Sequence, residues 1–116
     1  MDIKLEKALE FSNYMVTLNN QKRLIHEQYL QNLVHYVGGG QFSVTQELIS
    51  FCQSLLTLDQ DSTVLVDDNK QPIFIENLES FTDDILNVYA TASNNYLTEY
   101  DKIKKNRSVE GLVADD

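Results

Sequence analysis

The chain has 116 residues, of which 42% are hydrophobic and 23% are charged, and its net charge is −9. These values are typical of one globular domain and exclude a disordered or low-complexity chain. A single cysteine, Cys52, excludes an internal disulfide, and no apolar run approaches the ~20 residues that cross a bilayer. We therefore expect a soluble, intracellular protein.

Acidic residues are concentrated in the second half of the chain. Residues 1–37 contain four acids and four bases, whereas residues 38–101 contain eleven acids and one base, Lys70. An acidic surface repels phosphate backbones and attracts basic surfaces. The charge distribution therefore argues against direct binding of nucleic acid and favours a protein partner.

Apolar and aromatic side chains at alternating spacings of three and four predict one long helix over residues 3–37. Gly38, Gly39 and Gly40 follow it, and glycine readily adopts the left-handed conformation that ends a helix. We expect a glycine elbow at 38–40. A phosphate-binding loop would need a preceding strand and a following Lys-Ser or Lys-Thr pair, and the pattern has neither.

The next segment predicts a shorter helix over residues 43–58. Ser43 and Gln46 have the spacing of a capping box at its start. Its predicted buried face contains Val44, Leu48, Phe51, Cys52 and Leu55. Because Cys52 lies on this apolar face and no base is near it in sequence, we interpret it as a core residue rather than a nucleophile.

Two β-branched and aromatic runs on either side of a polar turn predict a β-hairpin over residues 63–76. Pro72 lacks a backbone N–H, so it should begin an edge strand. Both faces of this hairpin contain apolar side chains. An isolated hairpin is barely stable, so it must pack on helices or pair with strands of another subunit.

The last segment predicts a helix over residues 77–106, capped at its start by Asn77. It is the natural antiparallel mate of the first helix, and the polar stretches Asn19–Asn20 and Ser93–Asn95 could form one shared polar layer. The predicted fold class is α+β, mostly α, with a long antiparallel helix pair, a shorter helix and one β-hairpin. Residues 1–107 would form one domain. Gly111 should break the helix and separate an acidic-apolar tail, 108–116, that docks to a partner or folds back.

We find no pattern for catalysis, a cofactor or a metal, and we expect a protein that is not an enzyme. Asp59 opens a segment like a calcium loop, but Val64 and Lys70 stand where that loop needs glycine and glutamate. His26 and His35 are nine residues apart, which places them on opposite faces of the predicted helix. The pair Asp67–Asp68 is interpreted as a solvated turn.

Two groups of residues are candidates for binding a protein partner. The first is acidic and lies in and beside the hairpin: Asp59, Asp61, Asp67 and Asp68. The second is apolar and lies in the acidic tail, a composition found in short docking peptides: Val109, Leu112 and Val113.

The order of three segments resembles small proteins of myovirus-type phages that infect cyanobacteria. These segments are YVGGGQFSVTQELISF, VLVDDNKQPIFIENLESF and YDKIKKNRSVEGLV. The resemblance brings no functional motif, so no catalytic or binding residue follows from it. It implies a phage-encoded protein in the cytoplasm of an infected bacterial host or in the virion.

Together these patterns favour a non-enzymatic protein–protein interaction protein, a phage structural or assembly factor that acts as an oligomer. Lys22 and Asn32 interrupt the otherwise apolar seam of the first predicted helix, and the hairpin has apolar side chains on both faces. These half-polar and two-faced surfaces motivate oligomerisation. The alternative is an acidic regulator that binds a host or phage nucleic-acid enzyme, as a nucleic-acid mimic or through a docking peptide. We expect no membrane contact.

Overall fold

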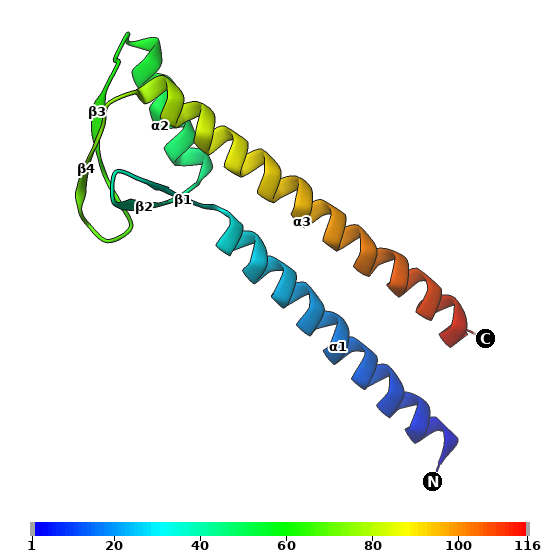
Figure 1. Ribbon diagram of the computed structural model, residues 1–116. Coiled ribbons are helices and arrows are strands. Elements are labelled where there is room, and N and C mark those ends of the chain that lie inside the picture. Colours follow the sequence, from blue (N-terminus) through cyan, green and yellow to red (C-terminus); the bar gives the residue numbers. More distant parts are fainter. Residues whose placement is uncertain (1, 116) are drawn as a thin grey trace. The chain divides into compact units, whose positions relative to one another are not determined.

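The computed structural model describes the backbone of residues 2–115 and the side chains of residues 2–105. Its elements follow in the order α1 (Ile3–Asn32), β1 (Val34–Val37), β2 (Gly40–Ser43), α2 (Gln46–Thr57), β3 (Thr63–Val66), β4 (Pro72–Ile75) and α3 (Leu78–Asp115) (Figure 1). The described fold is mostly α with some β, which confirms the predicted class. The four strands form two antiparallel hairpins, β1–β2 and β3–β4, where we predicted one.

The chain divides into two compact units, where the sequence predicted one domain over residues 1–107. The helical unit contains residues 1–28 and 95–116, and the hairpin unit contains residues 29–94. Both α1 and α3 contribute to each unit.

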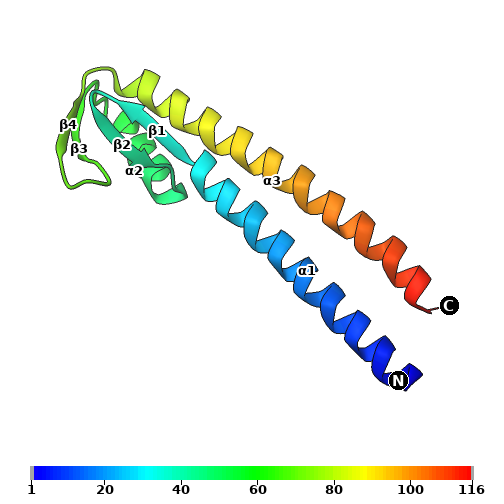
Figure 2. The same ribbon diagram turned by 60° about the horizontal axis from the view of Figure 1, so that its bottom comes forward.

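In the helical unit, α1 and α3 run antiparallel and side by side (Figures 1 and 2). The Nζ atom of Lys22 lies 5.7 Å from the ring centroid of Tyr100, and the rings of His26 and Tyr96 are 5.8 Å apart. Lys22 and His26 are four residues apart in α1, and their partners Tyr100 and Tyr96 are four residues apart in α3. The two contacts therefore define one antiparallel register. In this register Asn19 and Asn20 lie level with residues 102–103, so the predicted polar layer with Ser93–Asn95 does not form.

The hydrophobic core lies in the hairpin unit. It combines the inner faces of both hairpins with α2 and the beginning of α3, which Figure 2 shows close together. Its buried members are Leu33, Phe42, Val44, Ile49, Cys52, Leu65, Ile73, Ile75, Leu78, Phe81, Ile85 and Ala92. Cys52 is fully buried, which confirms its interpretation as a core residue. Phe51, which we expected on the buried face of α2, is exposed, and Ile49 takes the core position.

The predicted helix 3–37 is wrong beyond Asn32, because the chain turns into the β1–β2 hairpin. The run Val34–Val37 is β-branched and aromatic, which favours a strand. Gly38 and Gly39 have φ values of +58° and +80°, as required for a two-residue hairpin turn. The glycine triplet therefore forms a hairpin turn and not a helix end. A Cβ at Gly40 would lie 2.6 Å from Cγ1 of Ile73, so this position also needs glycine for close packing.

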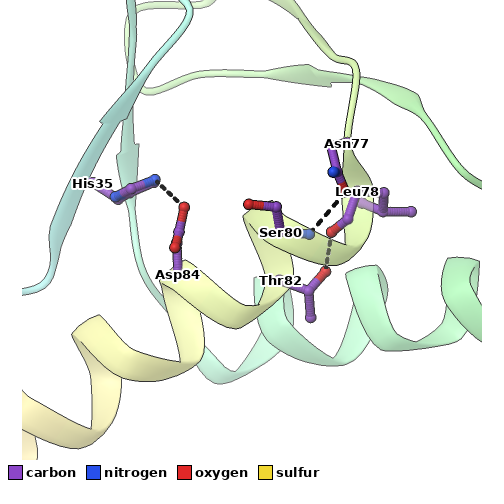
Figure 3. A network of polar contacts seen from close by, with 6 residues as sticks. All are labelled: His35, Asn77, Leu78, Ser80, Thr82 and Asp84. Carbon is purple, nitrogen blue, oxygen red and sulfur yellow. Dashed lines mark hydrogen bonds and ion pairs between the residues drawn. The ribbon is translucent and has the colours of Figure 1, made fainter.

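Besides the end of α1, two further helix ends differ from the prediction and one agrees with it. Ser43 ends β2 and does not cap α2; Thr45 is the N-cap, and its Oγ1 accepts a hydrogen bond from the N–H of Leu48 at 3.1 Å. Asn77 caps α3 as predicted, since its Oδ1 accepts from the N–H of Ser80 at 3.0 Å (Figure 3). The backbone of α3 continues through the break predicted at Gly111 and ends at Asp115.

Candidate functional site

Asp67, at the end of β3, anchors its own turn and the neighbouring hairpin. Its carboxylate accepts hydrogen bonds from the backbone N–H groups of Gln71 at 2.8 Å, Asn69 at 3.0 Å and Gln41 at 3.1 Å. The side chain is only 6% exposed. These bonds, that of Gln71 foremost, outweigh the opposing effect of desolvation and lower the pKa of Asp67 below its ordinary value.

Asp68 completes the connection between the hairpins. Its carboxylate accepts the N–H of Ser43 at 3.0 Å and the hydroxyl of Ser43 at 2.7 Å, and its own N–H donates to the carbonyl of Gln41 at 2.8 Å. Asp67 and Asp68 together cover the outer edge of β2. The interpretation of this pair as a solvated turn is wrong for Asp67, which is buried, whereas Asp68 is exposed in the turn. Both carboxylates bind strand β2.

Asp59 and Asp61 differ from this pair. Both are exposed in the loop between α2 and β3. Their carboxylates have no hydrogen bond or ion pair with any residue whose side chain the structure describes. Glu76 is also exposed and follows Ile75, the register partner of Thr63. Asp61 and Glu76 therefore lie next to the end of the hairpin where β3 begins, and Asp59 lies in the loop that precedes it.

Between these acids and the turn, the outer face of β3–β4 is apolar. Val64, Val66 and Phe74 are 58%, 67% and 63% exposed, whereas the alternate residues of the same strands face the core. Val64 and Phe74 are register partners, so the three side chains form one patch. We call Val64, Val66 and Phe74 the outer patch. The sequence signal was the apolar content of both hairpin faces, but it did not show which face lies outside.

A second apolar surface lies on α1. Leu5, Leu9 and Val16 are exposed and separated by four and seven residues, which places them along one helix face. We call these three residues the α1 stripe. Leu18, the one side chain of α1 described as buried, is nine residues after Leu9 and so faces the opposite way. The stripe therefore has no cover in the described part of the chain.

The beginning of α3 carries polar side chains of the kinds that catalytic sites use (Figure 3). Nε2 of His35, on β1, lies 3.9 Å from Oδ2 of Asp84, and the hydroxyl of Thr82 donates to the carbonyl of Leu78 at 2.7 Å. Burial raises the pKa of the Cys52 thiol, while a hydrogen bond with Thr82 acts in the opposite direction. The partner of this thiol is a hydroxyl and not a base, so the arrangement does not activate a nucleophile.

The remaining predicted residues fall outside this description. Val109, Leu112 and Val113 lie beyond the last described side chain, Lys105. Among described residues, no group of three or more His, Cys, Asp or Glu side chains is placed to hold a metal ion. None of the described helical segments is long and apolar enough to cross a membrane.

Comparisons with known proteins identify no relative of this chain. The chain matches no protein-family model, no curated protein and no solved structure.

Proposed function

We propose that the chain is a non-enzymatic protein–protein interaction protein that acts as an oligomer. The observation that supports this proposal most directly is the exposed α1 stripe. A helix of 30 residues with one described buried side chain gains little packing from its own chain, yet it exposes seven large apolar residues. Exposed apolar surface of this kind is typical of interfaces.

A second copy of the same helix is the occupant that fits the stripe. Its spacing of four and seven residues is that of a coiled-coil seam, which pairs like helices. Residues 1–37 carry equal numbers of acids and bases, so two copies of this segment approach without net repulsion. The acidic segment 38–101 would instead repel its own copy.

Sedimentation velocity tests this association. At about 50 µM we expect the wild-type chain to sediment as an oligomer, and the double variant Leu9→Lys with Val16→Lys to sediment as a monomer, because lysines on the seam face each other across the interface. The control is Leu58→Lys, which introduces a single lysine at an exposed apolar residue of the hairpin unit and should leave the oligomer intact. A wild-type chain that stays strictly monomeric contradicts the proposal.

The setting that we propose is a phage structural or assembly factor, in the cytoplasm of an infected bacterium or in the virion. The support is the resemblance of three sequence segments, together with a surface suited to assembly. Mass spectrometry of purified virions and of infected-cell lysates tests the setting. Detection in either supports it, and absence from both while the gene is transcribed contradicts it.

A second candidate is an acidic regulator of a nucleic-acid enzyme, and the free carboxylates of Asp59 and Asp61 favour it. Reversing both charges, Asp59→Lys with Asp61→Lys, should abolish capture of such an enzyme but leave oligomerisation through α1 intact. Asp67 and Asp68 are excluded from this variant because their carboxylates support the fold.

A further inference from the structure

We propose that the outer edge of β3 receives an extended strand from a partner protein. The partner strand would carry alternating apolar side chains and would place lysine or arginine beside the beginning of β3. This inference rests on the proposed interaction function, but it does not depend on oligomerisation through α1.

The first support is the open backbone of β3. Hydrogen-bonded pairs alternate along an antiparallel ladder, and the N–H of Asp67 donates to the carbonyl of Gln71. By this alternation the backbone N–H and C=O groups of Thr63 and Leu65 bond to β4. The same groups of Val64 and Val66 point away from β4. No backbone bond joins these four groups to another residue in the described part of the chain. They are ready to pair with an added strand.

The second support is that the outer edges of β2 and β4 are covered. Asp67 and Asp68 cover β2, as described above. Strand β4 begins with Pro72, which has no N–H, and its Phe74 carbonyl lies near the β1–β2 turn, 4.0 Å from a Cβ built on Gly38. Strand β3, with sequence TVLV, contains no proline or charge of the kind that blunts an exposed edge. Strand β1 also has an unpaired edge, but it exposes Tyr36 alone.

The third support is the outer patch beside the open edge. An added strand next to β3 would place its own side chains against Val64 and Val66 on the same face. Main-chain bonds would then supply affinity, and apolar contacts at every second residue would supply selectivity.

The acidic residues near β3 determine which kind of strand can bind there. Asp61 and Glu76 lie beside the beginning of β3, Asp59 precedes it by four residues, and the carboxylates of Asp67 and Asp68 lie just after its end. A second copy of β3 would bring carboxylates close to carboxylates, whether it paired parallel or antiparallel, and opposed like charges destabilise a sheet. A strand with a basic end is attracted by the same groups.

A peptide titration tests the proposal. The probe is a fluorescein-labelled peptide, KKVTVTVKK, measured by fluorescence anisotropy with the full chain, followed by amide hydrogen exchange of the complex by NMR. We expect saturable binding below about 1 mM that weakens as salt is raised. We also expect slower exchange of the Val64 and Val66 amides in the complex.

Matched peptides and variants separate the contributions. The peptide KKVTPTVKK cannot complete the ladder, and EEVTVTVEE reverses the charge, so each should bind at least about tenfold more weakly. The variant Val66→Lys should weaken binding by about tenfold through charge repulsion and loss of the patch, whereas Tyr36→Lys, an equally exposed change on β1, should not.

Three results would overturn the proposal: no binding at about 1 mM peptide, equal binding of the proline peptide, or protection of β1 amides in place of Val64 and Val66. Sedimentation separates its failure from that of the oligomer. Val66→Lys should leave the oligomeric state unchanged, and the double variant Leu9→Lys with Val16→Lys should leave peptide affinity unchanged.

Discussion

One carboxylate, that of Asp67, holds two hairpins in place. It accepts backbone N–H groups from its own turn, at Asn69 and Gln71, and from Gln41 on β2. A charged acceptor is suited to this position because it can receive three donors without offering one of its own. Position 67 therefore requires a carboxylate and not merely a polar residue.

We predict that Asp67→Asn lowers the free energy of unfolding at neutral pH, because the amide group brings N–H donors against the backbone donors that the carboxylate accepts. The folded-state pKa of Asp67 is lowered, so its stabilising contribution is present above the ordinary aspartate pKa of about 3.9 and is lost as pH falls below it. Urea unfolding from pH 7 to pH 3 should show the gap between wild type and variant narrowing on the acid side.

The control for this prediction is Asp59→Asn. It removes the same charge at an exposed carboxylate without described bonds, and it should change the free energy of unfolding little. A gap between wild type and Asp67→Asn that widens on acidification would contradict the linkage.

The roles of some single residues could be predicted from their neighbours in the sequence, but the role of Asp67 could not. Asn77 at a helix start and Pro72 at a strand start are recognisable because their roles depend on the adjacent backbone. The burial of Asp67 depends on Gln41, which is 26 residues away in the chain. Nothing in the local sequence around Asp67 indicates that distant donor, so this residue was predicted as part of a solvated turn.

At the scale of elements, the β1–β2 hairpin is a segment for which helical periodicity in the sequence gave a wrong prediction. The residues Tyr36 and Val37 continue the three-and-four spacing of α1, but they also belong to a strand–turn–strand pattern around Gly38 and Gly39. The choice between helix and hairpin depends on tertiary contacts, because the turn packs against Ile73 of the other hairpin. Likewise, spacing predicted two antiparallel helices but not their register, which the ring contacts of Tyr96 and Tyr100 determine.

This packing yields a prediction for the glycine triplet. We expect Gly40→Ala to destabilise the fold by about 1–3 kcal/mol, since its Cβ would meet buried Ile73 and force the side chain to move. Gly39→Asn is the matched change in the same turn. No atom lies within 4 Å of its Cβ and asparagine tolerates positive φ, so the expected cost is about 1 kcal/mol or less. Chemical denaturation measures both, and equal effects would contradict the packing argument.

At the scale of the whole molecule, the two units differ in how much apolar surface they bury. All members of the main core cluster belong to the hairpin unit. In the helical unit, the buried apolar residues among the described side chains are Leu18 and Ile103. Local stability follows burial, so the two units should open with different free energies. Oligomerisation through the α1 stripe would add stability to the helical unit in particular, by mass action.

Hydrogen exchange measured at two protein concentrations tests this directly. At about 1 µM, amides of α1 in residues 3–28 should exchange at least about tenfold faster than those of α2 and of residues 78–94. At about 100 µM the α1 amides should become protected while the hairpin unit changes little, because only the oligomer covers the stripe. The double variant Leu9→Lys with Val16→Lys should lose this concentration dependence. Protection of α1 that is equal at both concentrations in the wild type would show that the helix is stabilised within one chain, and would remove the main physical argument for an oligomer.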